Sequence, residues 1–284
     1  MLPNRLRHRF PLLLPLALLA GAAASPLQEG AGQGSGGIEA VGRRSAELQP
    51  IVQRQLASNG GAERVEALIG FDLAFTDVAV EDPAEEGGER VERPGETIQM
   101  SIGMAVSDRR VRMVQPLATG DTEREMVRIA AGEGMAVLID GERRDSEELA
   151  NEARGIAIEL LVVLDLVWGL VNGQINATPG VPRKRDGVTY DTVEAQFPEG
   201  RGLASAFRLY YDTESGLLRR CDQFNLSDGR RVVTLLFDDY VAGKGIQMPT
   251  RVSFLDRDRV LQRYWRFDGL AVDPEWPDTH FSVE

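Results

Sequence analysis

Few residues in this chain of 284 could do chemistry, because it has one cysteine, two histidines and no obvious catalytic motif beside its 44 acidic side chains. His280 lies near Asp278, but no serine occupies a Gly-x-Ser-x-Gly turn, which argues against a Ser-His-Asp hydrolase. Cys221 follows two arginines that could lower the pKa of its thiol. Without a histidine partner, a buried structural cysteine is the stronger interpretation. We therefore assign no catalytic residue.

Metal ions, cofactors and nucleic acids also find little support in this composition. A single cysteine cannot build a multi-thiolate zinc site, and the acidic residues show no calcium-loop spacing, so we expect no metal and no cofactor. The formal net charge of −12 argues against nucleic acid, which attracts clustered positive charge. So many carboxylates make close pairs inevitable, and an envelope hydrolase using paired carboxylates stays an alternative.

The first 24 residues have the pattern of a secretory signal peptide. Three arginines precede residue 10, an apolar stretch runs from Leu12 to Ala20, and small residues at 21–24 form a cleavage site before Ser25. An uncleaved anchor is the weaker interpretation, because the apolar stretch is well short of the roughly 20 residues that span a bilayer. Residues 25–42 predict a flexible glycine-rich leader. We expect a periplasmic protein whose mature chain has no membrane span.

The elements that must position any site begin after this leader. Apolar residues at helical spacing predict a helix from Arg43 to Ala57, then an Asn-Gly-Gly corner at 59–61 and a short helix at 62–68. Turn residues of hairpin length separate the segments of an antiparallel meander. Its predicted strands are 71–81, 97–106, 111–114, 125–131, 135–140, 188–197, 206–211, 217–225, 231–240, 247–255 and 259–270.

These elements predict one domain over residues 43–272. The acidic segment 83–95, rich in glycine and proline, predicts an exposed loop within it. Residues 273–284 are acidic and interrupted by prolines, and we expect them to form a loose tail.

One predicted strand has the clearest apolar face. Apolar residues alternate along it with smaller or more polar ones, the period-two pattern of a sheet with one buried face. The inward-facing residues are Ile98, Met100, Ile102, Met104 and Val106. Methionine is flexible and polarisable, so a face lined with it can adapt to irregular apolar ligands. Ordinary core filling is the competing interpretation.

A strong helix interrupts the meander, from a cap at Asp145 to a stop at Gly173. Its second half is apolar nearly all round and includes Leu160, Leu164 and Trp168. It must be covered on every side, because each large side chain left in water costs about 1.5–3 kcal/mol. A membrane span is the weaker alternative, since two acidic residues lie inside the apolar run. Wrapping the sheet around the helix would solve the packing problem.

Together these features resemble a known family. The segment from Phe207 to Arg219 leads into Phe-Asp-Asp-Tyr at 237–240, Gly-Ile at 245–246 and Met-Pro at 248–249. With the signal peptide, the glycine corner, the meander and the interrupting helix, this pattern resembles the bacterial lipoprotein carrier and receptor superfamily (LolA/LolB-like) over roughly residues 43–270. The resemblance implies a mainly β fold with α, in which a curved antiparallel sheet, an unclosed β-barrel, wraps around a helical lid or plug.

The same resemblance implies a function. It indicates a non-catalytic periplasmic protein that binds lipid acyl chains or lipoproteins, as a carrier or sensor related to outer membrane lipoprotein sorting, with an envelope protein as a further partner. The ligand would lie in the apolar concavity formed by the strand and helix residues named above. Acyl-carrying family members latch the lid with an arginine on the sheet, and no single arginine of this sequence matches it. The second interpretation is a secreted structural or interaction module whose core is permanently filled.

Overall fold

Alternating buried and exposed residues build one antiparallel sheet of 14 strands. The computed structural model describes residues 46–82, 89–104, 109–119, 122–131, 134–197 and 205–282; the predicted signal peptide and leader lie outside them. The strands are β1 (Gly70–Glu81), β2 (Val91–Gly103), β3 (Arg110–Thr119), β4 (Thr122–Ala131), β5 (Gly134–Ile139), β6 (Glu142–Arg143), β7 (Asn176–Pro179), β8 (Arg183–Arg185), β9 (Val188–Gln196), β10 (Ser205–Asp212), β11 (Leu218–Asn225), β12 (Arg231–Gly243), β13 (Ile246–Leu255) and β14 (Leu261–Val272). The helices are α3 (Gln49–Ser58), α4 (Ala62–Glu66) and α5 (Glu147–Asn172).

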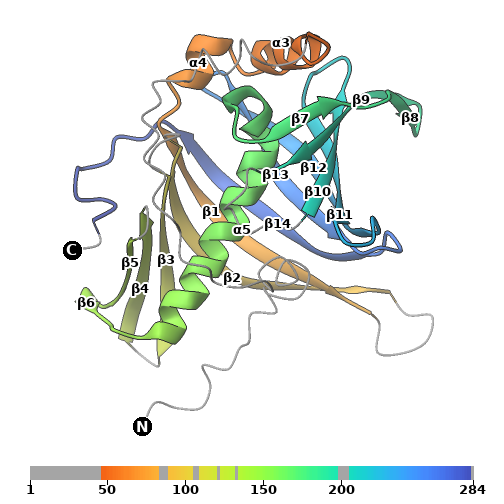
Figure 1. Ribbon diagram of the computed structural model, residues 1–284. Helices are drawn as coiled ribbons and strands as arrows, with labels where there is room; N and C mark the ends of the chain where they lie inside the picture. Colours follow the sequence, from red (N-terminus) through yellow and green to blue (C-terminus); the bar gives the residue numbers. More distant parts are fainter. Residues whose placement is uncertain are drawn as a thin grey trace.

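The sheet consists of two meanders joined in the middle (Figure 1). Its strand order is β6-β5-β4-β3-β2-β1-β14-β13-β12-β11-β10-β9-β7, and β8 also pairs with β9. The meanders meet where β1 pairs with β14, in a register that places Phe71 opposite Val272. β6 and β7 end the sheet at opposite edges, and the described strands do not close it into a barrel. The predicted fold class, an unclosed curved sheet with a helix inside, is confirmed.

The sheet forks between β2 and β3. Their pairing ends at Gln99 and Val114, and beyond this point β2 pairs with β1 while β3 pairs with β4. A β-bulge at Gly95 and Glu96 precedes the fork and bends β2. The predicted loop up to residue 95 is wrong at its end, because β2 already begins at Val91. Pro94 is tolerated there because this part of β2 pairs with β1 alone and has a free edge on its other side. Its missing N–H therefore removes no hydrogen bond to a second neighbouring strand.

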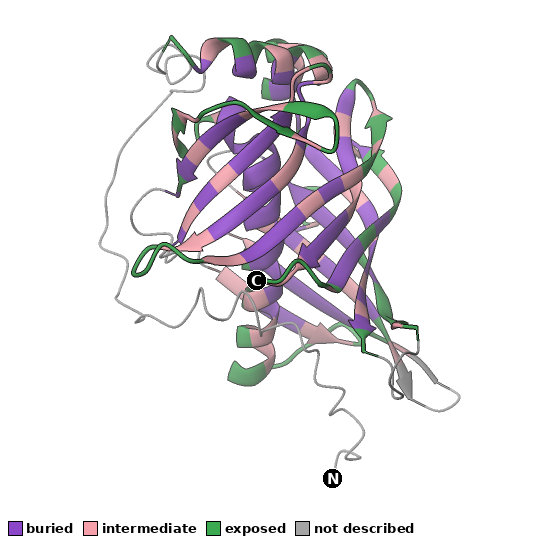
Figure 2. Ribbon diagram, turned by 90° about the vertical axis from the view of Figure 1, so that its right-hand side faces the viewer, coloured by how far each residue is buried: buried purple, intermediate pink, exposed green. Residues whose placement is uncertain are grey.

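α5 runs through the concave side of the sheet and is buried over most of its length (Figures 1 and 2). Its cap is Ser146 rather than the predicted Asp145: the Ser146 hydroxyl accepts a hydrogen bond from the Leu149 amide (3.4 Å). The predicted stop is confirmed, since Gly173 adopts a left-handed conformation with φ 70°. By length and composition α5 could cross a membrane, yet 78% of its most apolar window is buried in the protein. This burial favours a core helix.

α3 and α4 cover the end of the concavity where α5 terminates (Figure 1). α3 begins at Gln49, later than the predicted Arg43, because Pro50 in the first turn favours a start there. The glycine corner is confirmed, with positive φ at both glycines. Asn59 ties it to the sheet: its side-chain oxygen accepts from the Gln247 amide and its nitrogen donates to the Gln55 carbonyl, both at 2.9 Å.

The expectation of a loose C-terminal tail is wrong for residues 273–282. Asp273 accepts hydrogen bonds from Arg64 (2.6 Å) and from a backbone amide, and the Trp276 indole donates to Asp72 at 2.9 Å. Phe281 is buried against apolar residues of β4 and β5 on the outer face of the sheet. The tail is ordered because its aromatic side chains cover an apolar surface that would otherwise face water.

Candidate functional site

The structure brings the predicted binding residues together in one core. Each described member of the set is at most 3% exposed and belongs to the main apolar cluster between α5 and the sheet. These members are Ile98, Met100, Ile102, Met104, Leu160, Leu164 and Trp168. Val106 lies outside the described residues. The concavity is therefore filled by α5, and binding of a ligand by these residues stays a prediction.

Aromatic side chains line the concavity where the two meanders join, and sequence reasoning did not single them out. The Trp168 indole stacks on Phe71, with ring centroids 5.3 Å apart and an interplanar angle of 18°. On the neighbouring strands, Trp265 packs edge-on against Phe254 (4.8 Å) and Phe75 (5.5 Å). The rings on the sheet come from β1, β13 and β14, so they follow the junction of the two meanders.

Three acidic side chains of α5 enter this apolar face, and each pairs with an arginine from the sheet side. We call these contacts the helix–sheet ion pairs. They join Arg128 Nη2 to Glu152 Oε1 (3.3 Å), Arg263 Nη2 to Glu159 Oε2 (3.3 Å), and Arg109 Nη1 to Asp165 Oδ1 (2.5 Å). The acids span 13 residues of helix, or about 20 Å along its axis. The helix thus meets an arginine of the sheet side at three levels.

Arg263 on β14 serves two carboxylates. It contacts Glu159 of α5 and Asp77 of β1, each at 3.3 Å, and its guanidinium lies 4.5 Å from the centre of the Phe254 ring. Burial raises the pKa of Glu159 to about 7, against the opposing attraction of Arg263, and the nearby Asp77 raises it further. Burial also raises the pKa of Asp77. One positive charge therefore compensates two acids in a nearly dry environment.

Arg128 on β4 connects α5 to the fork in the sheet. It is only 1% exposed and donates a hydrogen bond to the Gln115 side-chain oxygen at 2.8 Å. Gln115 in turn donates to Glu96, which lies in the part of β2 that does not pair with β3. The other terminal nitrogen of Arg128 reaches Glu152. Burial lowers the pKa of Arg128, and the charges of Glu152 and Glu96 oppose this effect. Side chains from β2, β3, β4 and α5 thus form one continuous network of hydrogen bonds and an ion pair.

Sequence reasoning missed these arginines. The available signal was the presence of Glu159 and Asp165 inside an apolar helix, since buried acids require partners. The partners could not be chosen from the sequence, because Glu159 and Arg263 lie 104 residues apart.

Comparisons with known proteins concern the fold alone. No protein-family model matches the chain, and no curated protein matches it. A DUF1329 family protein from Desulfovibrio piger superimposes with a TM-score of 0.52 at 12% identity, covering 84% of this chain and 98% of that one. A LolA superfamily protein from Nitrosomonas europaea gives 0.50 at 13% identity, covering 81% and 97%. A proposed outer membrane lipoprotein-sorting protein domain from Vibrio parahaemolyticus gives 0.51 at 11% identity, covering 81% and 94%.

The chain has a LolA/LolB-like fold. In this LolA/LolB-like fold the helix–sheet ion pairs all have the same orientation: the sheet side supplies the three arginines, and α5 supplies the three carboxylates. The exception on the sheet is Asp77, which remains beside Arg263. Removing one partner of a buried pair typically costs about 3–5 kcal/mol, because the other charge is left uncompensated. Arg263 keeps Asp77 when α5 moves, so the carboxylates that another group must replace are those paired with Arg109 and Arg128.

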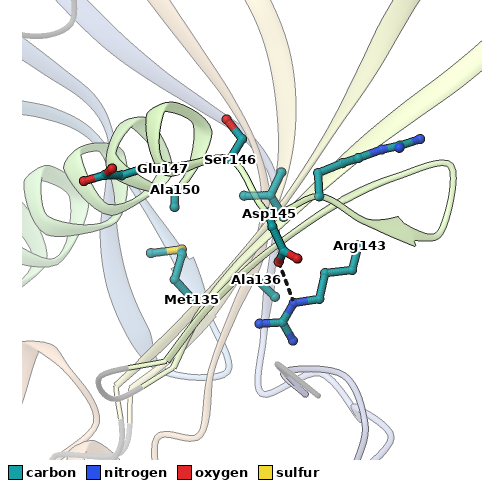
Figure 3. A pocket seen from close by; sticks show the side chains of 9 residues that line it. Met135, Ala136, Arg143, Asp145, Ser146, Glu147 and Ala150 are labelled. Atoms are coloured by element: carbon teal, nitrogen blue, oxygen red, sulfur yellow. Dashed lines mark ion pairs between the residues drawn. The ribbon is translucent and has the colours of Figure 1, made fainter.

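Two pockets lie outside the filled concavity of the LolA/LolB-like fold. The first, of about 350 Å³, lies between β5 and the start of α5, where Met135, Glu147 and Ala150 line it and the Arg143–Asp145 ion pair borders it (Figure 3). The second, of about 520 Å³, lies over β7, β9 and β10. Neither pocket is lined by the predicted binding residues, so both are surface features of this closed arrangement.

The residues considered for catalysis are not arranged for it. Cys221 is fully buried, and burial raises the pKa of its thiol well above the usual range, which suppresses the reactive thiolate. His280 stacks on Trp276 in the tail, where burial lowers its pKa. Among the described residues, no group of three or more His, Cys, Asp or Glu side chains could hold a metal ion.

Proposed function

We propose that the protein is a non-catalytic binding protein of the bacterial envelope, which takes up lipid acyl chains or the acyl chains of lipoproteins in the concavity that α5 fills. The LolA/LolB-like fold supports a carrier-like protein of this kind, and similar structures include a proposed lipoprotein-sorting domain. The periplasmic location expected from the N-terminal sequence belongs to the same proposal.

The observation that carries this proposal is the way α5 is held. Its apolar side chains fill the concavity, and its acidic side chains form ion pairs with sheet arginines in which another charged group can take their place. Exposing Leu160, Leu164 and Trp168 to water would cost about 1.5–3 kcal/mol each, so the helix stays in place without a ligand. An acyl chain restores the lost apolar contacts and makes an exchange feasible.

Two measurements test the proposal. The first is mass spectrometry of lipids extracted from the purified mature protein, and the second is the uptake of a fluorescent fatty acid by the wild type, Leu164→Ala and Ile158→Ala. Leu164 is buried against the sheet and Ile158 is 48% exposed on the same helix. Leu164→Ala should loosen α5 by about 2–5 kcal/mol and speed uptake, whereas Ile158→Ala should match the wild type.

A second candidate function rests on the complete burial of the predicted binding residues. In that case α5 is a permanent part of the core, and the protein is a structural or interaction module of the envelope. Absence of extracted lipid, together with no uptake by the wild type or by Leu164→Ala, would establish this candidate and refute the first.

A further inference from the structure

The helix–sheet ion pairs indicate which kind of ligand could take the place of α5 in the concavity. With all groups ionised, three arginines are opposed by five acids, namely the three helix carboxylates, Asp77, and Glu96, whose charge acts on Arg128. If α5 leaves with its carboxylates, the sheet side keeps three positive charges and two negative charges, a balance of +1. An apolar chain without a charge cannot compensate them.

The position of these charges indicates where a head group would lie. Glu152 has a 33% exposed side chain and marks the open end of the concavity, whereas Trp168 marks the closed end beneath α3 and α4. Glu152 and Glu159 are seven residues apart, about 10 Å along the helix axis, and Trp168 lies about 14 Å beyond Glu159. Arg128 therefore lies at the open end of the concavity, and Arg263 lies farther in beside the Phe254 and Trp265 rings. Arg109 pairs with Asp165 one helical turn before Trp168, which stacks on Phe71 at the closed end.

Both arginines are suited to an anion. Their guanidinium groups are nearly inaccessible to water while α5 is in place, and a buried guanidinium forms strong, directional hydrogen bonds with carboxylate or phosphate. Arg263 retains Asp77 as a partner, and Arg128 retains Gln115, so both stay oriented when the helix carboxylates are removed. α5 itself presents an apolar rod with Glu152 and Glu159 on one side, which is the chemistry of an acidic amphiphile.

We propose that the ligand is an acidic lipid, whose anionic head group replaces the Glu152 carboxylate on Arg128 at the open end, while its acyl chain runs past Arg263, which keeps Asp77, toward Trp168. This inference rests on the proposed lipid-binding function and specifies its ligand class. A neutral lipid with the same chain fills the apolar volume but leaves Arg128 without an ion-pair partner in place of Glu152, so it binds more weakly.

The test compares oleate with methyl oleate, which has the same chain without the negative charge. Binding of each to the delipidated mature chain is measured by displacement of a fluorescent fatty acid and by native mass spectrometry. Oleate should bind about tenfold or more tightly, because a hydrogen bond to a charged group contributes at least that difference. Equal binding of the two probes would overturn the acidic-lipid inference and leave the proposed function standing. Binding of neither would refute the proposed function itself.

A matched pair of variants separates ligand contact from structural support. Arg128→Gln and Glu152→Gln both remove the same ion pair, but only Glu152→Gln keeps the guanidinium for the ligand. The preference for oleate should disappear in Arg128→Gln and persist in Glu152→Gln. If both variants retain it, or both lose it, the role of Arg128 is refuted. Glu159→Gln is the matched control at the deeper position, where Asp77 already pairs with Arg263, so the preference for oleate should persist in it; circular dichroism confirms that each variant is folded.

Discussion

Replacing Glu159 by glutamine should make the protein more stable at alkaline pH and leave it nearly unchanged in acid. The ordinary pKa of this carboxyl group is 4.5, and in the fold it rises to about 7. Because each pKa unit corresponds to about 1.36 kcal/mol, the charged form is disfavoured in the native state by about 3 kcal/mol. The raised pKa already includes the attraction of Arg263, so this figure is the net penalty. Glutamine carries no charge and removes it, while Asp77 keeps Arg263 paired.

The sign of the pH dependence follows from proton binding. Below about pH 4.5 Glu159 is protonated in both states, and the wild type and the variant should have similar free energies of unfolding. Between pH 4.5 and 7 the native state keeps the proton that the unfolded state has released, so the wild type loses stability as the pH rises. Above pH 7 the difference between the two proteins should reach its full value of about 3 kcal/mol.

Urea denaturation at several pH values between 4.5 and 8 measures this difference. Glu148→Gln is the control, because Glu148 is exposed on the same helix and should leave the wild-type curve unchanged. The reasoning is refuted if Glu159→Gln is less stable than the wild type at pH 8, or if the difference between them does not grow with pH.

Three further substitutions or modifications test the packing of the core. Trp168→Ala should lower the free energy of unfolding by about 3–5 kcal/mol, because the buried indole stacks on Phe71; an unchanged urea midpoint would contradict this. Gly70→Ala should destabilise the protein by about 1–3 kcal/mol, since its Cβ would lie 2.1 Å from the Ile102 carbonyl oxygen, and a wild-type melting temperature would show that the strands accommodate it freely. The Cys221 thiol should react with a thiol reagent only in denaturant; rapid reaction of the native protein would mean that this strand opens.

Features that depend on a local sequence pattern were predictable. The apolar face of β2 follows from alternation, and the end of α5 follows from a glycine that can adopt the left-handed conformation. The apolar helix with a meander on either side also implied that the sheet must wrap around it, which the unclosed sheet confirms.

Features that depend on distant segments were not predictable. The fork depends on a bulge in β2 and on where β3 stops pairing with it, and neither has a local sequence pattern. The ordered tail depends on Trp276 and Phe281, two aromatic residues in an acidic segment whose partners are more than 100 residues away. The partners of the buried acids on α5 were also unpredictable, because the sequence contains many arginines and does not show which of them would form the ion pairs.

The junction of β1 and β14 has a consequence for how the chain reaches this structure. Each meander is built from sequence neighbours, but the seam between them joins residues about 200 positions apart, such as Phe71 and Val272, and such pairings form slowly. The ribosome releases the N-terminal segments first, so the edge of β1 waits without a partner until nearly the whole chain is made. An unpaired edge is a template for association with other chains. A chain that ends at residue 260 lacks β14 and exposes this edge, so it should self-associate in sedimentation experiments.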